Sequence, residues 1–234
     1  MLTLAFDTAF KTASVAILQD NVVLYDVLIN VDLNHSEVLL PAVNQACLQT
    51  EIRVTDIDLF ACTVGPGSFT GLRIGAGTLK GFILATGKPA VGVSSLMALA
   101  LNAGKSSKII CSVMDAGRGQ VYAAYFRYNQ KGLLEQIGAD EVVNPADIDP
   151  DCKKEVFFVG EGAIKYAGII RGTNKKNIVI ASGQQQYIRA SSVAVLGIEK
   201  YRRNELLDAE KFGPVYLRSA DAYPKKTFFK KINL

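Results

Sequence analysis

The sequence predicts an α/β protein with two lobes, and two observations support this fold class. Through residues 1–103, apolar strand-like runs alternate with helical segments in the order β-β-β-α-β-α-β-α. In addition, a strand that ends in an aspartate, then a turn and a second strand, occurs in residues 2–18 and again in residues 109–126. We therefore expect an N-terminal lobe over residues 1–103 and a C-terminal lobe with a basic tail over residues 104–234.

The N-terminal lobe begins with three strand-like runs separated by short turns, at residues 2–6, 13–18 and 22–29. A helix is expected from His35 to about Gln49, with Asn34 as its N-cap and Glu37 in the capping-box position. Its apolar residues cover an arc of about 160°, whereas a helix packed on one sheet needs about 100°. Either the lobe wraps this helix completely or the helix presents a second apolar face to another chain, and the pattern favours the second interpretation.

The next strand, residues 59–64, leads into the stretch Gly65-Pro66-Gly67-Ser68-Phe69-Thr70-Gly71-Leu72-Arg73-Ile74-Gly75 and a helix over residues 70–86. A glycine-rich turn at a helix start presents backbone N–H groups that suit an anion. The stretch nevertheless departs from both the Walker spacing and the dinucleotide-binding spacing. The sequence therefore does not favour a nucleotide-binding loop here.

The spacing of the small residues indicates another use. Residues four apart share a helix face, and two such sets follow the turn: Gly71 with Gly75, and Gly77 with Gly81 and Ala85. Because glycine costs roughly 1 kcal/mol inside a helix relative to alanine, repeating it needs a reason. We favour close packing, within the chain or between chains, over an anion site.

The remaining elements follow from shorter patterns. A strand at residues 89–93 precedes a helix at residues 95–102 that Ser94 caps. A further helix is expected from Ser191 or Ser192 to about Arg203. The second half also contains four strand-like runs, at residues 109–114, 120–126, 155–159 and 177–181.

Composition and charge exclude several classes of protein. With 49% hydrophobic and 21% charged residues, the chain is an ordinary globular protein. We expect a cytoplasmic protein without membrane contact, because there is no signal-peptide pattern, no membrane-length apolar run and no Cys-x-x-Cys pair. The net charge of +4 resides in the segment 225–231, which holds four lysines and no acid. A solubilising tail is favoured there, and direct tRNA binding is the alternative.

Two aspartates are candidate metal-water ligands near a phosphate. Asp7, followed by Thr8, and Asp115, followed three residues later by Arg118, each end a strand before a tight turn. Backbone hydrogen bonding within the turn accounts for the same positions, and the sequence favours this structural interpretation. His35 is the only histidine and is expected to be exposed, so neither a histidine-based metal site nor a Ser-His-Asp triad is expected.

Several of these motifs resemble the bacterial TsaB (YeaZ) family. They are Phe6-Asp7-Thr8, His35 to Pro41, Gly65 to Gly75, Lys80-Gly81, Gly92 to Leu96, Asp115 to Arg118 and Pro214 to Arg218. The resemblance implies an actin-like (sugar kinase-like) ATPase fold made of two RNase H-like lobes. It also implies a part in making the threonylcarbamoyl modification on the adenosine beside the anticodon of tRNAs that read ANN codons.

One local comparison separates the chain from the catalytic TsaD family. After the strand that matches residues 89–93, the TsaD family carries an H-x-x-x-H metal pair, and this chain has Ser95 and Leu99 at those positions. Neither residue is a useful metal ligand. We therefore interpret the chain as a non-catalytic subunit that activates a TsaD-like transferase, not as an enzyme.

The resemblance implies the partners as well. They are a TsaD-like catalytic subunit, a TsaE-like ATPase and tRNA reached through the complex, with a homodimer when the catalytic partner is absent. No cofactor is expected in the isolated chain, and ATP or ADP belongs to the assembled complex. The partner interface is expected on the first two helices, at Leu39, Val43, Leu72, Arg73, Gly75 and Thr78.

An alternative function stays open from the residues. In an ATP-binding enzyme of the actin-like or sugar-kinase class, Asp7, Thr8, Asp115 and Arg118 would lie near phosphate. In the non-catalytic interpretation, the same four residues are a vestige of such a nucleotide site.

Overall fold

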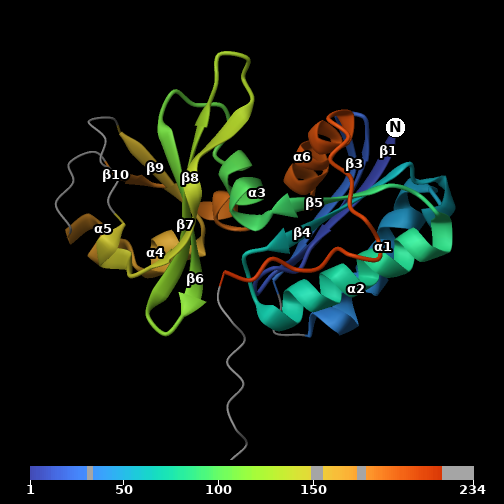
Figure 1. Cartoon of the computed structure of the whole chain (residues 1–234), viewed down its shortest axis with the longest axis horizontal. Coiled ribbons are helices and arrows are strands. Elements are labelled where there is room, and N and C mark those ends of the chain that lie inside the picture. Colours follow the sequence, from blue (N-terminus) through green and yellow to red (C-terminus); the bar gives the residue numbers. More distant parts are fainter. Residues whose placement is uncertain (31–33, 149–154, 173–177, 218–234) are drawn as a thin grey trace, which may run out of the picture.

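The computed structural model describes residues 1–30, 34–148, 155–172 and 178–217, and it arranges them as two lobes (Figure 1). Each lobe contains one five-stranded sheet with helices against it. The predicted α/β class is therefore confirmed. The lysine-rich segment 225–231 lies outside the described residues.

The first sheet has the strand order β3-β2-β1-β4-β5. Strands β1 (Leu2–Asp7), β2 (Ala13–Gln19) and β3 (Val22–Ile29) form the expected antiparallel meander. Strands β4 (Leu59–Gly65) and β5 (Ala90–Ser94) extend the sheet parallel to β1. Because helices cover both faces of this sheet, β1 and β2 are buried almost throughout instead of alternating.

The second sheet repeats this topology. Strands β6 (Ile109–Gly117), β7 (Gln120–Tyr128) and β8 (Leu134–Val143) form a meander, and β9 (Val156–Val159) and β10 (Ile178–Ile180) run parallel to β6. Numbered from its own first strand, each sheet therefore has the order 3-2-1-4-5. The faint sequence repeat is confirmed as a repeat of whole lobes. Strand β8 was missed because its side chains are mostly polar and exposed.

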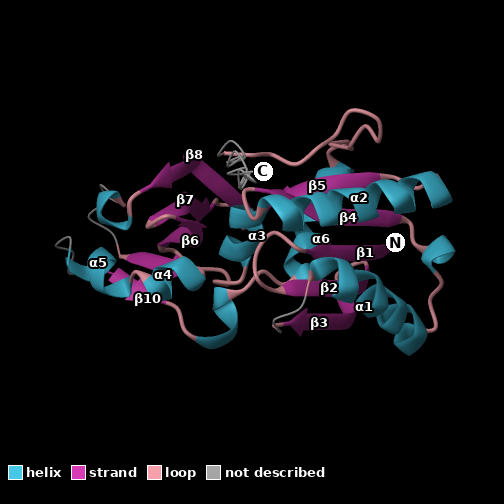
Figure 2. Cartoon of the chain, turned by 90° about the horizontal axis from the view of Figure 1, so that it is seen from below, coloured by secondary structure: helices cyan, strands magenta, loops and turns pink. Residues whose placement is uncertain are grey.

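The helices form layers around the two sheets (Figures 1 and 2). Helices α1 (His35–Thr50) and α2 (Phe69–Thr86) share one buried cluster on the outer face of the first sheet. Helices α3 (Ser95–Leu101) and α6 (Ala190–Arg202) lie between the sheets. The short helices α4 (Glu161–Lys165) and α5 (Ala167–Gly172) cover the outer face of the second sheet. Three 3-10 turns complete the described elements: Val54–Asp56, Pro145–Asp147 and Gly183–Gln186.

The structure corrects the boundary between the lobes. Helix α6 packs on β1, β2, β4 and β5 of the first sheet, although it follows the second sheet in sequence. The chain after it stays with the first lobe, since the N–H of Leu207 donates to the carbonyl of Ala90 (2.9 Å) and the N–H of Val215 to that of Val64 (2.7 Å). Residues 190–217 thus belong to the N-terminal lobe. The predicted division at residue 103 is correct only for the point where the chain first passes from the first lobe to the second.

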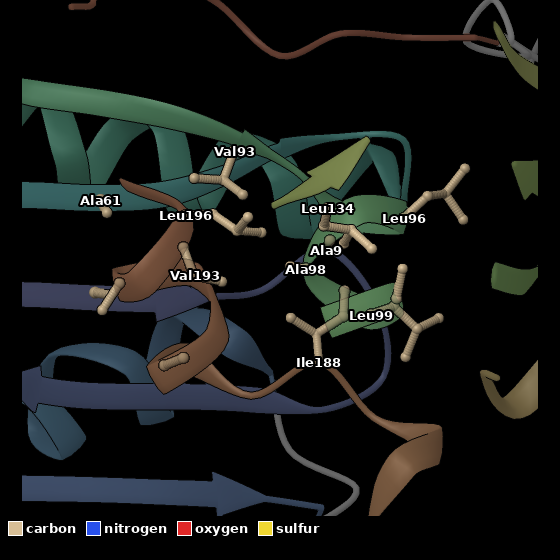
Figure 3. Close-up of a cluster of buried hydrophobic side chains, with 14 of the residues drawn as sticks. Ala9, Ala61, Val93, Leu96, Ala98, Leu99, Leu134, Ile188, Val193 and Leu196 are labelled. Carbon is tan, nitrogen blue, oxygen red and sulfur yellow. The ribbon is translucent and has the colours of Figure 1, made fainter. Parts of the chain in front are cut away.

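The two lobes share one hydrophobic core. A single buried cluster contains Ala61 and Val93 of the first sheet, Leu99 of α3, Leu196 of α6 and Leu134 of the second sheet (Figure 3). An internal contact of this kind excludes water between the lobes, so both lobes contribute to one folding unit.

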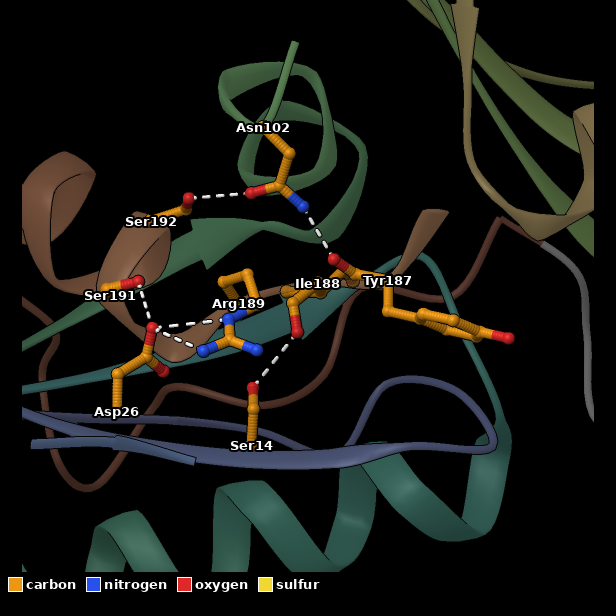
Figure 4. A network of polar contacts seen from close by, with 8 residues as sticks. All are labelled: Ser14, Asp26, Asn102, Tyr187, Ile188, Arg189, Ser191 and Ser192. Atoms are coloured by element: carbon orange, nitrogen blue, oxygen red, sulfur yellow. Dashed lines mark hydrogen bonds and ion pairs between the residues drawn. The ribbon is translucent and has the colours of Figure 1, made fainter. Parts of the chain in front are cut away.

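Polar contacts fix the segment that returns from the second lobe to α6 (Figure 4). Arg189 donates to Asp26 from Nη2 (2.9 Å) and Nε (3.2 Å), and the hydroxyl of Ser191 donates to the same carboxylate (2.6 Å). The side-chain amide of Asn102 donates to the carbonyl of Tyr187 (2.5 Å) and accepts from the hydroxyl of Ser192 (2.8 Å). Ser191 and Ser192 therefore tie α6 to its neighbours instead of capping it, which corrects that expectation.

Of the other two predicted helix caps, the structure confirms the one at Ser94 and shows no side-chain cap at Asn34. Ser94 accepts from the N–H of Met97 (3.3 Å), which confirms it as the cap of α3. Asn34 is the N-cap residue of α1, but its amide donates to the carboxylate of Glu37 (2.7 Å) and forms no side-chain cap. Among the described residues, every helix is too short or too polar to cross a membrane.

Candidate functional site

The turn between β1 and β2 is held against the start of α2. The hydroxyl of Thr8 donates to the carbonyl of Gly71 (2.8 Å), and the N–H of Ser68 donates to the carbonyl of Ala9 (2.6 Å). The ring of His35 is bonded to the carbonyl oxygen of Phe10 and is half-buried, which corrects the expectation of an exposed side chain. At the start of α2, the N–H of Ser68 therefore donates to the Ala9 carbonyl of the chain itself, where a bound anion was considered.

Glycine is required where this turn meets α2. A Cβ atom on Gly71 would lie 2.0 Å from the carbonyl oxygen of Thr8, and one on Gly75 would lie 2.6 Å from the Thr8 hydroxyl. By contrast, Cβ atoms on Gly77 and Gly81 would meet no atom within 4 Å in the part of the chain that the structure describes. The first pair of glycines thus serves close packing inside the chain, and the second pair leaves open space on the outer side of the helix.

Asp7 is fully buried at the end of β1. Its Oδ1 accepts from the hydroxyl of Thr63 (2.5 Å) and from the N–H of Ala9 (3.0 Å), and its Oδ2 has no hydrogen-bond partner among the described residues. Burial raises the pKa of this carboxyl to about 6, although the hydrogen bonds from Thr63, Ala9 and Thr8 act to lower it. These contacts are those of a residue that shapes its own turn.

Asp115 occupies the equivalent position near the end of β6. It forms an ion pair with Lys165 through Oδ2, and its Oδ1 accepts from the N–H of Gly117 (3.0 Å) and the hydroxyl of Tyr166 (3.2 Å). Partial burial acts to raise the pKa of Asp115, but the bonds from Lys165, Gly117 and Tyr166 outweigh it and hold this pKa below its usual value. The ammonium group of Lys165 thus already neutralises the candidate metal ligand.

Glu161 extends this cluster toward the first lobe. Its Oε1 accepts from the N–H of Asp115 (2.7 Å), and burial raises the pKa of its carboxyl, with Lys11 of the β1–β2 turn among the groups that act to lower it. The structure therefore brings the turns of both lobes toward the same region. Arg118, one of the predicted residues, is exposed at the tip of the β6–β7 turn with a positive φ of 54°.

The residues present do not fit a metal-bound nucleotide. Within residues 1–30, 34–148, 155–172 and 178–217, no three His, Cys, Asp or Glu side chains form a group that could hold a metal. Asp7 is enclosed with Thr63, and Asp115 is paired with Lys165. The nucleotide-binding alternative therefore finds no support in these contacts and stays an untested prediction.

Four of the six predicted interface residues are buried inside the first lobe. Leu39, Val43 and Leu72 are between 1% and 3% exposed, and Gly75 lies against Thr8 and Cys62. Their position corrects the prediction, because partner contacts require an accessible surface. Of the other two predicted contacts, Arg73 is exposed and Thr78 is half-buried.

The same two helices nevertheless present an apolar surface to solvent. Leu40 and Leu48 of α1 are 54% and 65% exposed, and Leu84 of α2 is 82% exposed. We call these three leucines, together with the open glycines Gly77 and Gly81, the outer helical face. Sequence reasoning chose Leu39, Val43 and Leu72 as contacts instead of these three leucines, because periodicity along a helix does not say which of its sides the sheet covers.

Comparison with known proteins gives consistent results along most of the chain. A family model described as "TsaD: tRNA N6-adenosine threonylcarbamoyltransferase" matches residues 30–225. The chain is 33% identical over 228 residues to the tRNA threonylcarbamoyladenosine biosynthesis protein TsaB of Bacillus subtilis (strain 168), a match that covers 96% of this chain and 97% of the relative. The protein of the same name from Escherichia coli (strain K12) is 28% identical over 235 residues, with 96% and 98% covered.

Solved structures show the same relationship. YeaZ from Pseudomonas aeruginosa matches with a TM-score of 0.82 at 26% identity, covering 92% of this chain and 99% of that one. Component A of the (R)-2-hydroxyglutaryl-CoA dehydratase of Acidaminococcus fermentans matches with a TM-score of 0.54 at 12% identity, covering 86% and 99%. The second likeness concerns the fold alone and agrees with the actin-like arrangement of two related lobes.

Proposed function

Because the chain belongs to the TsaB (YeaZ) family of tRNA threonylcarbamoyladenosine biosynthesis proteins, we propose that it is the non-catalytic, activating subunit of a tRNA threonylcarbamoyltransferase. It acts by pairing with a TsaD-like catalytic subunit, and a TsaE-like ATPase joins the pair. It reaches tRNA through this complex and self-associates when the catalytic subunit is absent.

The outer helical face carries this proposal. Exposed apolar patches mark surfaces that bind a partner, and here Leu40 and Leu48 lie on α1 while Leu84 lies on the neighbouring α2, together with the glycines Gly77 and Gly81 that leave room for a close approach. A partner helix that packs between α1 and α2 would cover the leucines and approach the backbone at Gly77 and Gly81. The inner sides of α1 and α2 are already used by the core of the first lobe.

The surroundings of the candidate chemical groups support a non-catalytic role. Ser95 is fully buried and Leu99 is part of the core between the lobes, at the two positions where the related TsaD family carries metal-binding histidines. Asp115 is neutralised by Lys165, and Asp7 is enclosed. Leu99, Asp7 and Asp115 thus each have structural contacts within the chain, which supports a non-catalytic role.

Reconstitution in vitro tests the proposal. A TsaD-like subunit, a TsaE-like ATPase, tRNA and threonylcarbamoyl-adenylate are combined with and without this chain, and modified adenosine is measured. We expect modification only when this chain and the TsaD-like subunit are both present. Modification by this chain alone would overturn the non-catalytic assignment, and modification that does not depend on this chain would overturn the activating role.

Two surface variants locate the site of pairing. Leu48→Glu and Leu84→Glu are expected to abolish co-elution with the TsaD-like subunit and the modification that depends on it. Leu133→Glu is the matched control, because Leu133 is 41% exposed in the second lobe, away from α1 and α2. If all three variants behave like the natural chain, the outer helical face is not the docking site.

A further inference from the structure

The described chain ends in a strap, residues 204–217, that runs along α2 from the C-terminal end of the helix toward its N-terminal end (Figure 1). Backbone hydrogen bonds hold the strap at Leu207 and at Val215. Its aromatic side chains reach α2 at two points, through Phe212 and Tyr216. The strap therefore borders the outer helical face along most of α2.

The first of these contacts fixes a guanidinium group. The Cζ atom of Arg73 lies 3.9 Å from the centre of the Phe69 ring, and its Nε donates to the Tyr216 hydroxyl (3.3 Å). The rings of Phe69 and Tyr216 are themselves 4.9 Å apart. No carboxylate of the described residues pairs with Arg73. The aromatic rings therefore hold the guanidinium group in place, and its terminal nitrogens form no ion pair within the described part of the chain.

The second contact holds an ammonium group two helical turns further on. The Nζ atom of Lys80 lies 5.0 Å from the centre of the Phe212 ring. Seven residues separate the two cations, which places them on the same side of α2 about 10 Å apart along its axis. At roughly 100° per residue, Gly77 of the outer helical face lies next to both cations, and Leu84 lies one turn beyond Lys80 on the same side. Helix α2 contains no acidic residue, so cation–π contacts replace ion pairs at both positions.

We propose that Arg73 and Lys80 select the partner of the outer helical face, favouring a helix of a different chain with two carboxylates about 10 Å apart over a second copy of this chain. This inference rests on the proposed function and names the chemistry of the partner. In a two-fold pair the same surface meets itself. Helix α2 of each copy would then present two cations and no acidic side chain to the other copy. A phosphate chain would also attract the cations, but the adjoining Leu84 and open glycines suit a protein helix.

Charge reversal tests this selection, and the expected effects have opposite signs for the two partners. Arg73→Glu and Lys80→Glu are each expected to weaken pairing with the TsaD-like subunit by about tenfold or more. Each is expected to strengthen self-association, because an acid then faces the cations of the second copy. Sedimentation at low and at high salt measures both equilibria. Salt is expected to weaken pairing of the natural chain with the TsaD-like subunit and to strengthen its self-association.

Two controls separate charge from structure. Lys131→Glu changes the net charge equally at an exposed turn of the second lobe and is expected to alter neither equilibrium. Tyr216→Phe removes the hydrogen bond to Arg73 but keeps both cations, so it is expected to retain the preference for the TsaD-like subunit. If Tyr216→Phe loses pairing as fully as Arg73→Glu, Arg73 only anchors the strap and the inference is wrong.

The outcomes also distinguish this inference from the proposed function. If Arg73→Glu and Lys80→Glu pair with the TsaD-like subunit as tightly as Lys131→Glu, the selection is overturned while the docking role stands. If the natural chain forms no complex with that subunit, the proposed function itself fails. If the substitutions weaken retention of tRNA and leave protein pairing unchanged, the cations serve a phosphate chain and not an acidic helix.

Discussion

The hydroxyl of Thr8 donates a 2.8 Å hydrogen bond to the carbonyl oxygen of Gly71, which lies 63 residues further along the chain. This bond joins the β1–β2 turn to the first turn of α2, and the backbones approach so closely that Gly71 has no space for a side chain. The glycine-rich stretch, the feature of the sequence most suggestive of nucleotide binding, is thus used to pack the first lobe together.

Substitutions of glycine by alanine on α2 should have opposite effects on stability. Gly71→Ala is expected to lower the free energy of unfolding by about 3 kcal/mol, because the new Cβ would overlap the Thr8 carbonyl. Gly77→Ala is expected to raise it by up to about 1 kcal/mol, because its Cβ meets open space. Urea denaturation measures both values. Equal effects at the two positions would show that the packing at Thr8 is not what requires Gly71.

Leucines on opposite sides of α1 and α2 should separate stability from pairing. Leu39→Glu is expected to unfold the first lobe or to cost more than about 3 kcal/mol, because Leu39 is 1% exposed in its core. Leu84→Glu is expected to change the free energy of unfolding by less than about 0.5 kcal/mol while abolishing pairing. Circular dichroism melts and co-elution give the two readouts. A folded, unpaired Leu39→Glu chain would argue against the burial described above.

Asp7 should make stability depend on pH. Its pKa is raised from 3.8 to about 6 in the folded chain, so the folded state keeps a proton that the unfolded state has lost between these values. The stabilising contribution of Asp7 to the free energy of unfolding is therefore greatest below pH 3.8 and is lost as the pH rises through about 6. Asp7→Asn should remove this dependence and raise the free energy of unfolding at pH 7 by up to about 3 kcal/mol.

The measurement is a series of urea denaturations of both chains between pH 4 and pH 8, compared by difference so that other groups cancel. The asparagine can keep the hydrogen bonds from Thr63 and Ala9, which makes it a fair replacement. A constant difference across this range would mean that the carboxyl of Asp7 titrates normally.

Lys165 should control the ionisation of Asp115. Lys165→Met removes the ion pair and its hydrogen bond, while the partial burial that raises the pKa of Asp115 remains. We expect the pKa of Asp115 to rise, as followed by carbon-13 NMR of the side-chain carboxyl. Lys108→Met, which breaks a pair with Glu155 elsewhere in the second lobe, is the control and should leave the pKa of Asp115 unchanged.

The network at Asp26 should hold the return of the chain to the first lobe. Asp26→Asn removes the partner of Arg189 and is expected to cost about 1–3 kcal/mol, because both side chains are largely covered. Thermal denaturation and tryptic cleavage after Arg189 both report the loss. Asp20→Asn, at an exposed pair with the N-terminus, should have little effect on either measurement. Equal stability of the two variants would mean that the network does not anchor α6.

The sequence by itself determined the α/β class, the order of most elements, the cap at Ser94 and the repeat that ends in Asp7 and Asp115. These features depend on local periodicity and turn chemistry, which neighbouring residues encode. The family was also readable from the motifs, since the glycine-rich stretch and its flanks lie within one continuous segment. Strand β8 escaped because an exposed polar strand has no apolar pattern.

Only the tertiary structure decided which side of α1 and α2 is covered, where residues 190–217 pack and what Asp115 is bound to. Leu39 and Leu84 are both leucines in helical segments whose neighbours in sequence are largely apolar. Only the position of the sheet places Leu39 in the core and Leu84 on the surface. The partners of Asp115 and Arg73 lie 50 and 143 residues away. Contacts across such distances follow from the packing of whole elements, which periodicity along a single helix or strand does not encode.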